Sequence, residues 1–195
     1  SDNKQGALKV TNNSLDLAVA GVGMFITASP DDGSISYTRD GSFLIDREGV
    51  LMTTDKRRVL NELGETIVIP PQKVDESGMT SLLDTIQINN RGRIKLAYGD
   101  GSIVEVGNVG LARFGNIAGL KPAGNAQFVT TEKSGPAIVG VPMADSYGQV
   151  IQGHLEASNA IVTDELVKLM RAQQAYAGSS RLLQSAVEME KSLTG

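Results

Sequence analysis

The sequence predicts a mainly β protein with a long C-terminal α-helix. Short apolar runs separated by glycine-containing turns fill residues 15–152, and the stretch 153–195 has no proline and repeats its apolar residues at helical spacing. We therefore expect an extended N-terminal segment (1–14), a compact β meander or open-barrel domain (15–152) and a C-terminal coiled-coil-forming helix (153–195) that serves as an assembly tail.

The C-terminal stretch has the spacing of a coiled-coil seam. Its apolar residues step by fours and threes, with polar interruptions at Gln173 and Ser180. Such a seam needs a partner helix to bury it, and an uninterrupted helical pattern of well over ~25 residues indicates a coiled coil or a repeat. Ser158 and Asn159 have the side chains of helix N-caps. We predict that assembly depends on the seam residues Val162, Leu166, Leu169, Tyr176, Leu183 and Val187.

Turn residues divide the β part into runs of strand length. The cluster 30–33 contains Asp-Gly, which tolerates the positive φ of hairpin turns, so it should pair the run 24–26 with 36–38. Later glycines recur with strand-length runs between them, which is typical of a meander. We expect an edge strand at 66–71 that ends at two prolines, a polar loop at 72–80 and an extended, loop-rich path from 115 to 148.

Composition excludes several classes of protein. The net charge of −4 and the pI near 5.1 provide no basic surface for nucleic acid or anionic membrane. There is no cysteine, which excludes disulfides and thiolate chemistry. No apolar run approaches the about 18 residues of a membrane helix. The N-terminus has neither an initiator methionine nor the pattern of a signal peptide, so we expect a processed or trimmed chain.

No pattern in the sequence indicates an active site. His154 is the only histidine and has no neighbouring residues that would make a catalytic or metal-binding group. The Asp-Gly pairs lack the spacing of a calcium loop and are ordinary turn chemistry. The pair Gly21 and Gly23 lacks the third glycine and the following helix of a dinucleotide fingerprint. We expect no enzyme activity, no cofactor and no metal site.

Three blocks of residues resemble the bacterial flagellar rod and hook family. The first covers 5–8 and 11–25, the second is the run 37–43 followed by Asp46, Gly49 and Leu51, and the third comprises residues of the C-terminal stretch: Gly153, Glu156, Ser158, Asn159, 165–167, Met170, Gln173, Ala175 and Tyr176. The blocks occur in the family's order and span nearly the whole chain. Met24 and Gln174 depart from the family pattern, and the long helix that precedes the first block in the family is missing.

The resemblance implies a structural axial subunit of the flagellar basal-body rod, of the distal rod type, that self-assembles into a helical tubular drive shaft for motility. Its implied partners are copies of itself, neighbouring rod and hook proteins, the flagellar export apparatus and the surrounding rings, with no nucleic acid and no membrane insertion. The implied location is the basal body, in the periplasm or beyond, reached by type III export without a cleaved signal peptide.

Other functions remain open at this point. Within the family, the chain could be a hook or proximal rod subunit. Outside it, a β-rich module for a glycan or calcium with an oligomerising helix, or a hydrolase of the cell wall, would also fit a β domain with an assembly tail. The low aromatic content of 4% and the absence of ligand spacing argue against the ligand-binding module. The hydrolase would need a pair of carboxylates or a metal set in a cleft, and the sequence offers no candidate beyond scattered acids.

Overall fold

The computed structural model describes residues 6–157, and contacts divide the chain into two units at Glu156 and Ala157. The described residues form strands and one short 3-10 helix, η1 (Ile117–Gly119). The strands are β1 (Leu8–Val10), β2 (Leu17–Ala20), β3 (Met24–Ala28), β4 (Ile35–Thr38), β5 (Phe43–Ile45), β6 (Leu51–Thr53), β7 (Arg58–Val59), β8 (Gln72–Val74), β9 (Thr80–Ile88), β10 (Arg93–Tyr98), β11 (Ile103–Asn108), β12 (Leu111–Arg113), β13 (Lys121–Gly124), β14 (Gln127–Val129), β15 (Ile138–Gly140), β16 (Gln149–Gln152) and β17 (His154–Glu156).

The predicted fold class is wrong in its helical part. Residues 6–157 contain no α-helix, and residues 158–195 lie outside the described residues. Where we predicted the helix to begin, the chain instead forms β17, which pairs antiparallel with β1. The physical reason is that the backbone groups of His154, Leu155 and Glu156 pair with those of β1, near the start of the chain. The spacing of apolar residues within one segment gives no information about such a distant partner.

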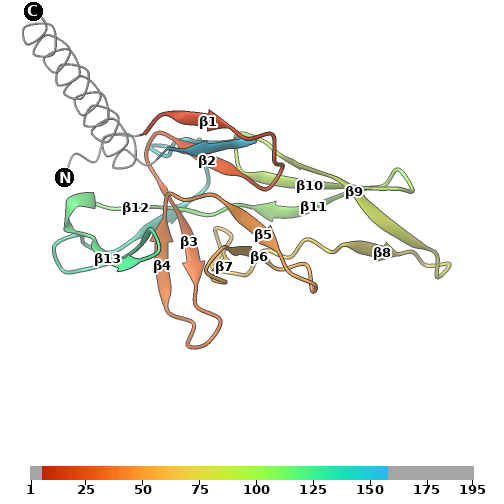
Figure 1. Cartoon of the computed structure of the whole chain (residues 1–195), viewed down its shortest axis with the longest axis horizontal. Coiled ribbons are helices and arrows are strands. Elements are labelled where there is room, and N and C mark those ends of the chain that lie inside the picture. The colour runs from red at the N-terminus through yellow and green to blue at the C-terminus, as the bar shows by residue number, and fades with distance from the viewer. Residues whose placement is uncertain (1–5, 158–195) are drawn as a thin grey trace, which may run out of the picture. The chain divides into compact units, whose positions relative to one another are not determined.

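The strands form four sheets (Figure 1). The largest has the order β13-β14-β4-β3-β7-β6-β5, with β12 beside β3 and β15 beside β12. A second sheet has the order β11-β10-β9-β8, and the pairs β2–β16 and β1–β17 complete the domain. Only the second sheet is a simple meander. In the first, strands from the second half of the chain return to pair with β3 and β4.

The predicted hairpin at 30–33 is confirmed. Strands β3 and β4 pair antiparallel from Phe25 with Thr38 to Ala28 with Ile35. Ser34 O accepts the Ser29 N–H at 2.9 Å, and Gly33 has a φ of +70°, which glycine adopts without strain.

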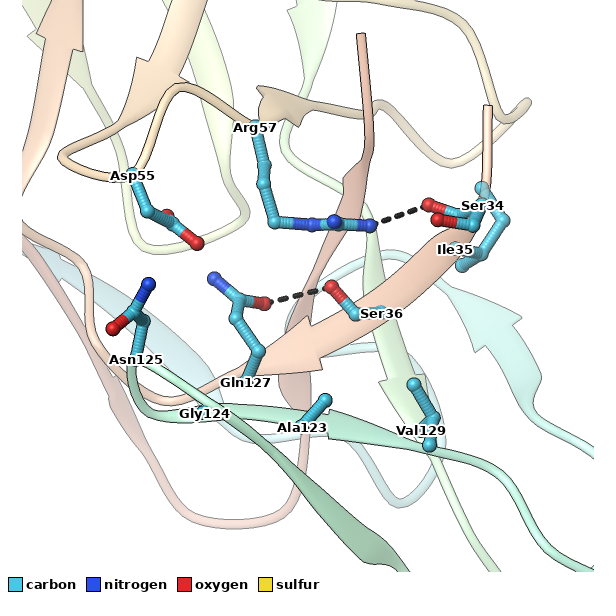
Figure 2. Close-up of a pocket in the computed structure, with 10 residues that line it drawn as sticks. All are labelled: Ser34, Ile35, Ser36, Asp55, Arg57, Ala123, Gly124, Asn125, Gln127 and Val129. Atoms are coloured by element: carbon cyan, nitrogen blue, oxygen red, sulfur yellow. Dashed lines mark hydrogen bonds between the residues drawn. The ribbon is translucent and has the colours of Figure 1, made fainter. Parts of the chain in front are cut away.

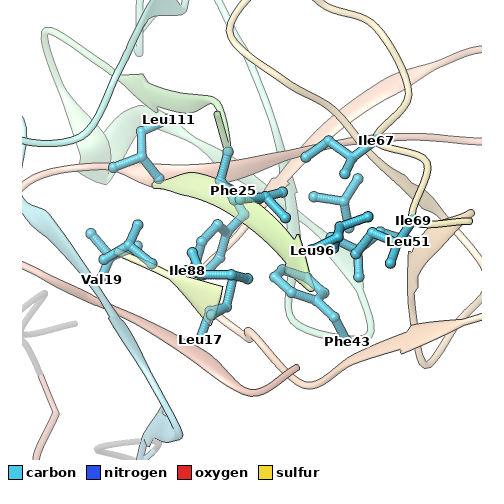
Figure 3. Close-up of a cluster of buried hydrophobic side chains, with 14 of the residues drawn as sticks. Leu17, Val19, Phe25, Phe43, Leu51, Ile67, Ile69, Ile88, Leu96 and Leu111 are labelled. Carbon is cyan, nitrogen blue, oxygen red and sulfur yellow. The ribbon is translucent and has the colours of Figure 1, made fainter. Parts of the chain in front are cut away.

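Strand β3 is buried on both faces, which explains its continuous apolar sequence. Phe25 lies in the larger core cluster, and Met24 and Ile26 lie in a second cluster with Tyr37 and Phe114. The larger cluster draws on strands of three sheets (Figure 3): Leu17, Val19, Phe25, Phe43, Leu51, Val59, Ile67, Ile69, Ile88, Ile94, Leu96, Tyr98, Val109, Leu111 and Val150. At its centre the Phe25 and Phe43 rings meet edge to face, with centroids 5.0 Å apart.

Three predicted segments, one of them an edge strand, differ in detail from the structure. The expected loop 72–80 contains β8 and the start of β9, which form a hairpin around a turn at Asp75. The expected edge strand 66–71 makes only isolated bridges, such as Val50 with Val68. The path 115–148 contains η1 and three strands. In each case the pairing comes from segments that are distant in sequence or too short to show alternation.

Acid is expected to loosen the aspartate-capped turns. The Ser34 backbone N–H lowers the pKa of Asp32 from 3.8 to about 2, and hydroxyl groups of Ser77 and Ser102 lower the pKa values of Asp75 and Asp100. Because the folded pKa is depressed, each turn is stabilised above the ordinary pKa, near 3.8, and this stabilisation is lost as pH falls through the folded value. Carboxyl NMR titration should place the Asp32 midpoint near 2.

The variant Ser77→Ala supplies the control. It is expected to raise the midpoint of Asp75, because it removes the hydroxyl that donates at 2.6 Å to Asp75 Oδ1, and to leave Asp32 unchanged. An unchanged midpoint for Asp75 would contradict the assigned cause.

Candidate assembly site

The chain enters and leaves the described domain through paired strands. In β1 and β17, Leu8 lies opposite Glu156 and Val10 lies opposite His154. Thr11 N–H donates to Gly153 O at 2.8 Å, and Gly153 N–H donates to Asp16 O at 2.7 Å. The connections to residues 1–5 and 158–195 therefore lie side by side.

A partly buried ion pair fixes these connections to the domain, and we call it the Arg39 joint. Arg39 Nε lies 3.8 Å from Glu156 Oε2, and the other Glu156 oxygen accepts the Gly6 N–H at 2.8 Å. The Arg39 guanidinium also donates to Val19 O at 3.2 Å and to Gly21 O at 2.9 Å. One side chain thus ties the end of β2 to β17.

The electrostatics of the Arg39 joint follow from its burial. Desolvation lowers the pKa of Arg39, and the Glu156 carboxylate opposes this effect by favouring the charged form. A guanidinium remains protonated under such opposing influences because its ordinary pKa lies far above neutral pH. The joint therefore holds a charged pair, and removal of either partner would leave the other charge poorly compensated.

The residues flanking Arg39 set its position. Thr38 Oγ1 donates to Ala126 O at 3.0 Å and anchors the end of β4. Asp40 Oδ1 accepts the Ser42 N–H at 3.0 Å and shapes the turn that follows. Gly41 lies against the backbone of Leu17, with no room for a side chain. The run 37–43, which we call the Arg39 corner, therefore links the end of β4, the turn that follows it and the ion pair with Glu156.

A polar pocket of about 290 Å³ lies beside β4 and β14 (Figure 2). Gln127 Oε1 accepts from Ser36 Oγ at 2.8 Å and from Thr27 Oγ1 at 3.0 Å. Arg57 Nε donates to Thr27 Oγ1 at 3.3 Å, and its Nη2 donates to Ser34 O. These groups satisfy one another and join β3, β4 and β14. We assign the pocket a structural role.

The described residues offer no grouping of three or more metal-ligating side chains. His154 Nδ1 lies 2.9 Å from Gln152 O, so one ring nitrogen is already engaged by backbone. No helix within residues 6–157 has the length and apolar composition to cross a membrane.

The six predicted seam residues, from Val162 to Val187, all lie outside the described residues. The site that the structure brings together is instead the Arg39 joint with β1 and β17, which sequence reasoning missed. Arg39 belongs to a block that we singled out, so its importance was visible. Glu156 belongs to another such block, but the contact between the two residues was not visible, because they lie in distant parts of the sequence.

Comparison with known families matches two parts of the chain. The D1 domain of flagellar hook protein FlgE/F/G matches residues 18–96, which contain most of the first sheet and the Arg39 corner. The C-terminal domain of the flagellar basal body rod FlgEFG protein matches residues 151–195, which begin at β16 and include Glu156. The Arg39 joint therefore connects the two matched regions.

Curated relatives cover nearly the whole chain. Flagellar basal-body rod protein FlgG of Agrobacterium fabrum is 36% identical over 95% of this chain and 65% of its own length. FlgG of Buchnera aphidicola subsp. Schizaphis graminum is 32% identical over 97% of this chain and 68% of its own length. FlgF of Caulobacter vibrioides is 30% identical over 96% of this chain. This chain spans about two thirds of the length of these FlgG relatives. The chain belongs to the flagellar basal-body rod protein family.

Proposed function

We propose that this chain is a structural subunit of the distal rod of the bacterial flagellar basal body. The observation that carries the proposal is its identity of 36% and 32% to two FlgG proteins over 95% and 97% of its length. The described residues support a mechanical role. Their buried apolar side chains form two continuous cores, and the polar side chains of the pocket hydrogen-bond to one another, so that they hold strands together and need no ligand.

The mechanism requires that the β domain keep its own shape under load. Paired strands β1 and β17 provide two connections, and the Arg39 joint adds a third constraint through Glu156. Force applied to the domain would load backbone hydrogen bonds across this pair together with the ion pair. A domain whose two ends are joined in this way would resist being pulled apart by torque.

The same proposal includes partners and location. Copies of this chain and neighbouring rod or hook proteins would form the helical tube through heterologous contacts. The export apparatus and the surrounding rings would be further partners, and the subunit would reach the periplasm without a cleaved signal peptide. We assign no catalytic step to any residue.

The assembly contacts that we propose outside the described residues are Val162, Leu166, Leu169, Tyr176, Leu183 and Val187. Their apolar character at repeating spacing supports this assignment. Replacing Leu166 and Leu169 by aspartate should abolish polymer formation, since two charges would be buried in an apolar contact. Sedimentation and electron microscopy of the purified chain measure the polymer, and circular dichroism reports whether the β domain remains folded.

Lys168→Asp is the matched control, because it changes the net charge as much as the double variant does and lies between the two leucines. It is expected to keep assembly largely intact. Polymer formed equally well by the double variant and by wild type would contradict the assigned contacts.

A further inference from the structure

We propose that the β8–β9 hairpin of one subunit docks on the solvent-exposed part of the sheet formed by β5, β6, β7, β3 and β4 in a second copy of this chain. The inference rests on the proposed function, in which copies associate. It adds a specific contact between β domains, separate from the seam residues of the C-terminal stretch.

The docking hairpin presents an apolar surface to solvent. Gln72 lies opposite Leu82 and Val74 lies opposite Thr80, so Val74 and Leu82 share one face of the hairpin. Their exposed fractions are 59% and 67%, and Met79 in the adjoining turn is 69% exposed. Three large apolar side chains exposed together are unusual for a surface that stays in water.

The hairpin is preformed and projects from the domain (Figure 1). Asp75 Oδ1 accepts from Ser77 N–H at 2.9 Å and from Met79 N–H at 2.8 Å, which fixes the turn. Lys73 Nζ donates to Ser102 Oγ at 3.2 Å on the other face. Because β8 is the edge of its sheet and β9 pairs only with β8 at this end, the hairpin reaches away from the core. A rigid projecting element loses little entropy on binding.

The receiving surface is a row of side chains across neighbouring strands, which we call the Arg58 row. Leu44 of β5 lies opposite Met52 of β6, and Met52 lies opposite Arg58 of β7. Arg58 in turn lies opposite Ala28 of β3, and Ala28 lies opposite Ile35 of β4. Directly opposed residues point to the same face, so all members of the row share one side of the sheet.

The Arg58 row is open to solvent. Leu44 is 51% exposed and Ile35 is 42% exposed, with the exposed Arg58 between them. Toward β12 and β14 the same face is covered by the second core cluster, which includes Ile26 and Tyr37 and against which Phe128 packs. The row is thus the uncovered end of a face that is elsewhere buried.

The two surfaces are complementary in charge and polarity. The hairpin turn carries Glu76, whose carboxylate makes no ion pair within residues 6–157, and Arg58 likewise has no ion pair there. Apolar side chains flank the charge on both surfaces. A contact between unlike patches is heterologous and repeats from copy to copy, and it builds a helical polymer when the rotation between copies does not close a ring.

Charge reversal tests the contact in the full chain. Glu76→Arg and Arg58→Glu should each raise the critical concentration for polymerisation about tenfold, because an attraction becomes a repulsion. The double variant carries the reversed pair in every contact and should return the critical concentration to near the wild-type value. Glu132→Arg and Arg91→Glu make the same charge changes at other exposed positions and should have little effect.

Disulfide trapping supplies a second readout that does not need long polymers. Because the chain contains no cysteine, a mixture of Glu76→Cys and Arg58→Cys variants can form a disulfide only at the new positions. In an equimolar mixture, oxidation should yield mixed dimers well above the twofold excess over each homodimer that random pairing would give.

The outcomes separate this inference from the proposed function. Wild-type polymer with unchanged critical concentrations in both charge variants, or no rescue in the double variant, would overturn the docking contact and leave the rod assignment standing. If the wild-type chain formed no polymer, the rod assignment would be contradicted, and the disulfide mixture would still decide the contact. Mixed dimers at or below the twofold excess of random pairing would overturn it.

Discussion

Replacing Gly41 by alanine is expected to destabilise the β domain by about 3 kcal/mol or more, a cost at the upper end for overpacking. A Cβ at this position would lie 1.7 Å from Leu17 O and 3.1 Å from Phe25 Cε2. Backbone displacement cannot relieve the clash cheaply, since Leu17 N–H donates to Gly41 O at 3.0 Å and Leu17 is fully buried. Chemical denaturation followed by circular dichroism measures the loss.

Gly99→Ala is the matched control for this substitution. The nearest atom to an added Cβ at Gly99 is Leu82 O at 3.8 Å, an ordinary van der Waals distance. The control is expected to shift the free energy of unfolding by less than about 1 kcal/mol. Equal denaturation midpoints for the two variants would show that the close approach at Gly41 is not a determinant of stability.

Phe43→Ala should cost about 3–5 kcal/mol, the range for removing a buried aromatic ring. Phe43 is 1% exposed, and its ring meets Phe25 edge to face at an interplanar angle of 81°. The substitution removes this contact and leaves a cavity between β3, β5 and β6, which the surrounding strands can fill only in part. Thermal and denaturant unfolding should both show the loss.

The adjacent residue provides an internal control for Phe43. Leu44 lies on the opposite face of β5 and is 51% exposed, so Leu44→Ala should change the free energy of unfolding by less than about 1 kcal/mol. Since Leu44 belongs to the Arg58 row, the same variant should weaken polymerisation. A larger stability loss for Leu44→Ala than for Phe43→Ala would contradict the assignment of the two faces.

Local signals in the sequence predict local structure well. The turn at 30–33 predicts the β3–β4 hairpin, because an Asp-Gly pair and its flanking runs are contiguous. The runs that became β5, β6, β10 and β11 are likewise recognisable, since each lies next to a glycine-containing turn. The apolar run of β3 indicates burial, although alternation alone cannot reveal that two separate cores lie on its two faces.

Long-range pairing is the part that the sequence does not reveal. The predicted helix starts at Gly153 and so includes residues that fold as β17. These residues form a strand because the pairing of Glu156 with Leu8 outweighs the local helical preference. The partnership of Arg39 with Glu156 has no local signature either. The resemblance to rod proteins marked both residues as part of family blocks, but only the structure shows that the two blocks meet.

The β2–β16 pair has a consequence for biosynthesis. Leu17, Ala18 and Val19 of β2 are completely buried, yet their backbone partners in β16 are Gln152, Ile151 and Val150. During synthesis β2 leaves the ribosome long before β16. The nascent chain therefore carries an apolar strand without its backbone partner until nearly the whole domain has emerged. Contacts of such high sequence separation also slow folding after release. Newly made subunits therefore spend an interval in which they can be bound by chaperones or aggregate, and the domain cannot close while its C-terminal strands are still being synthesised.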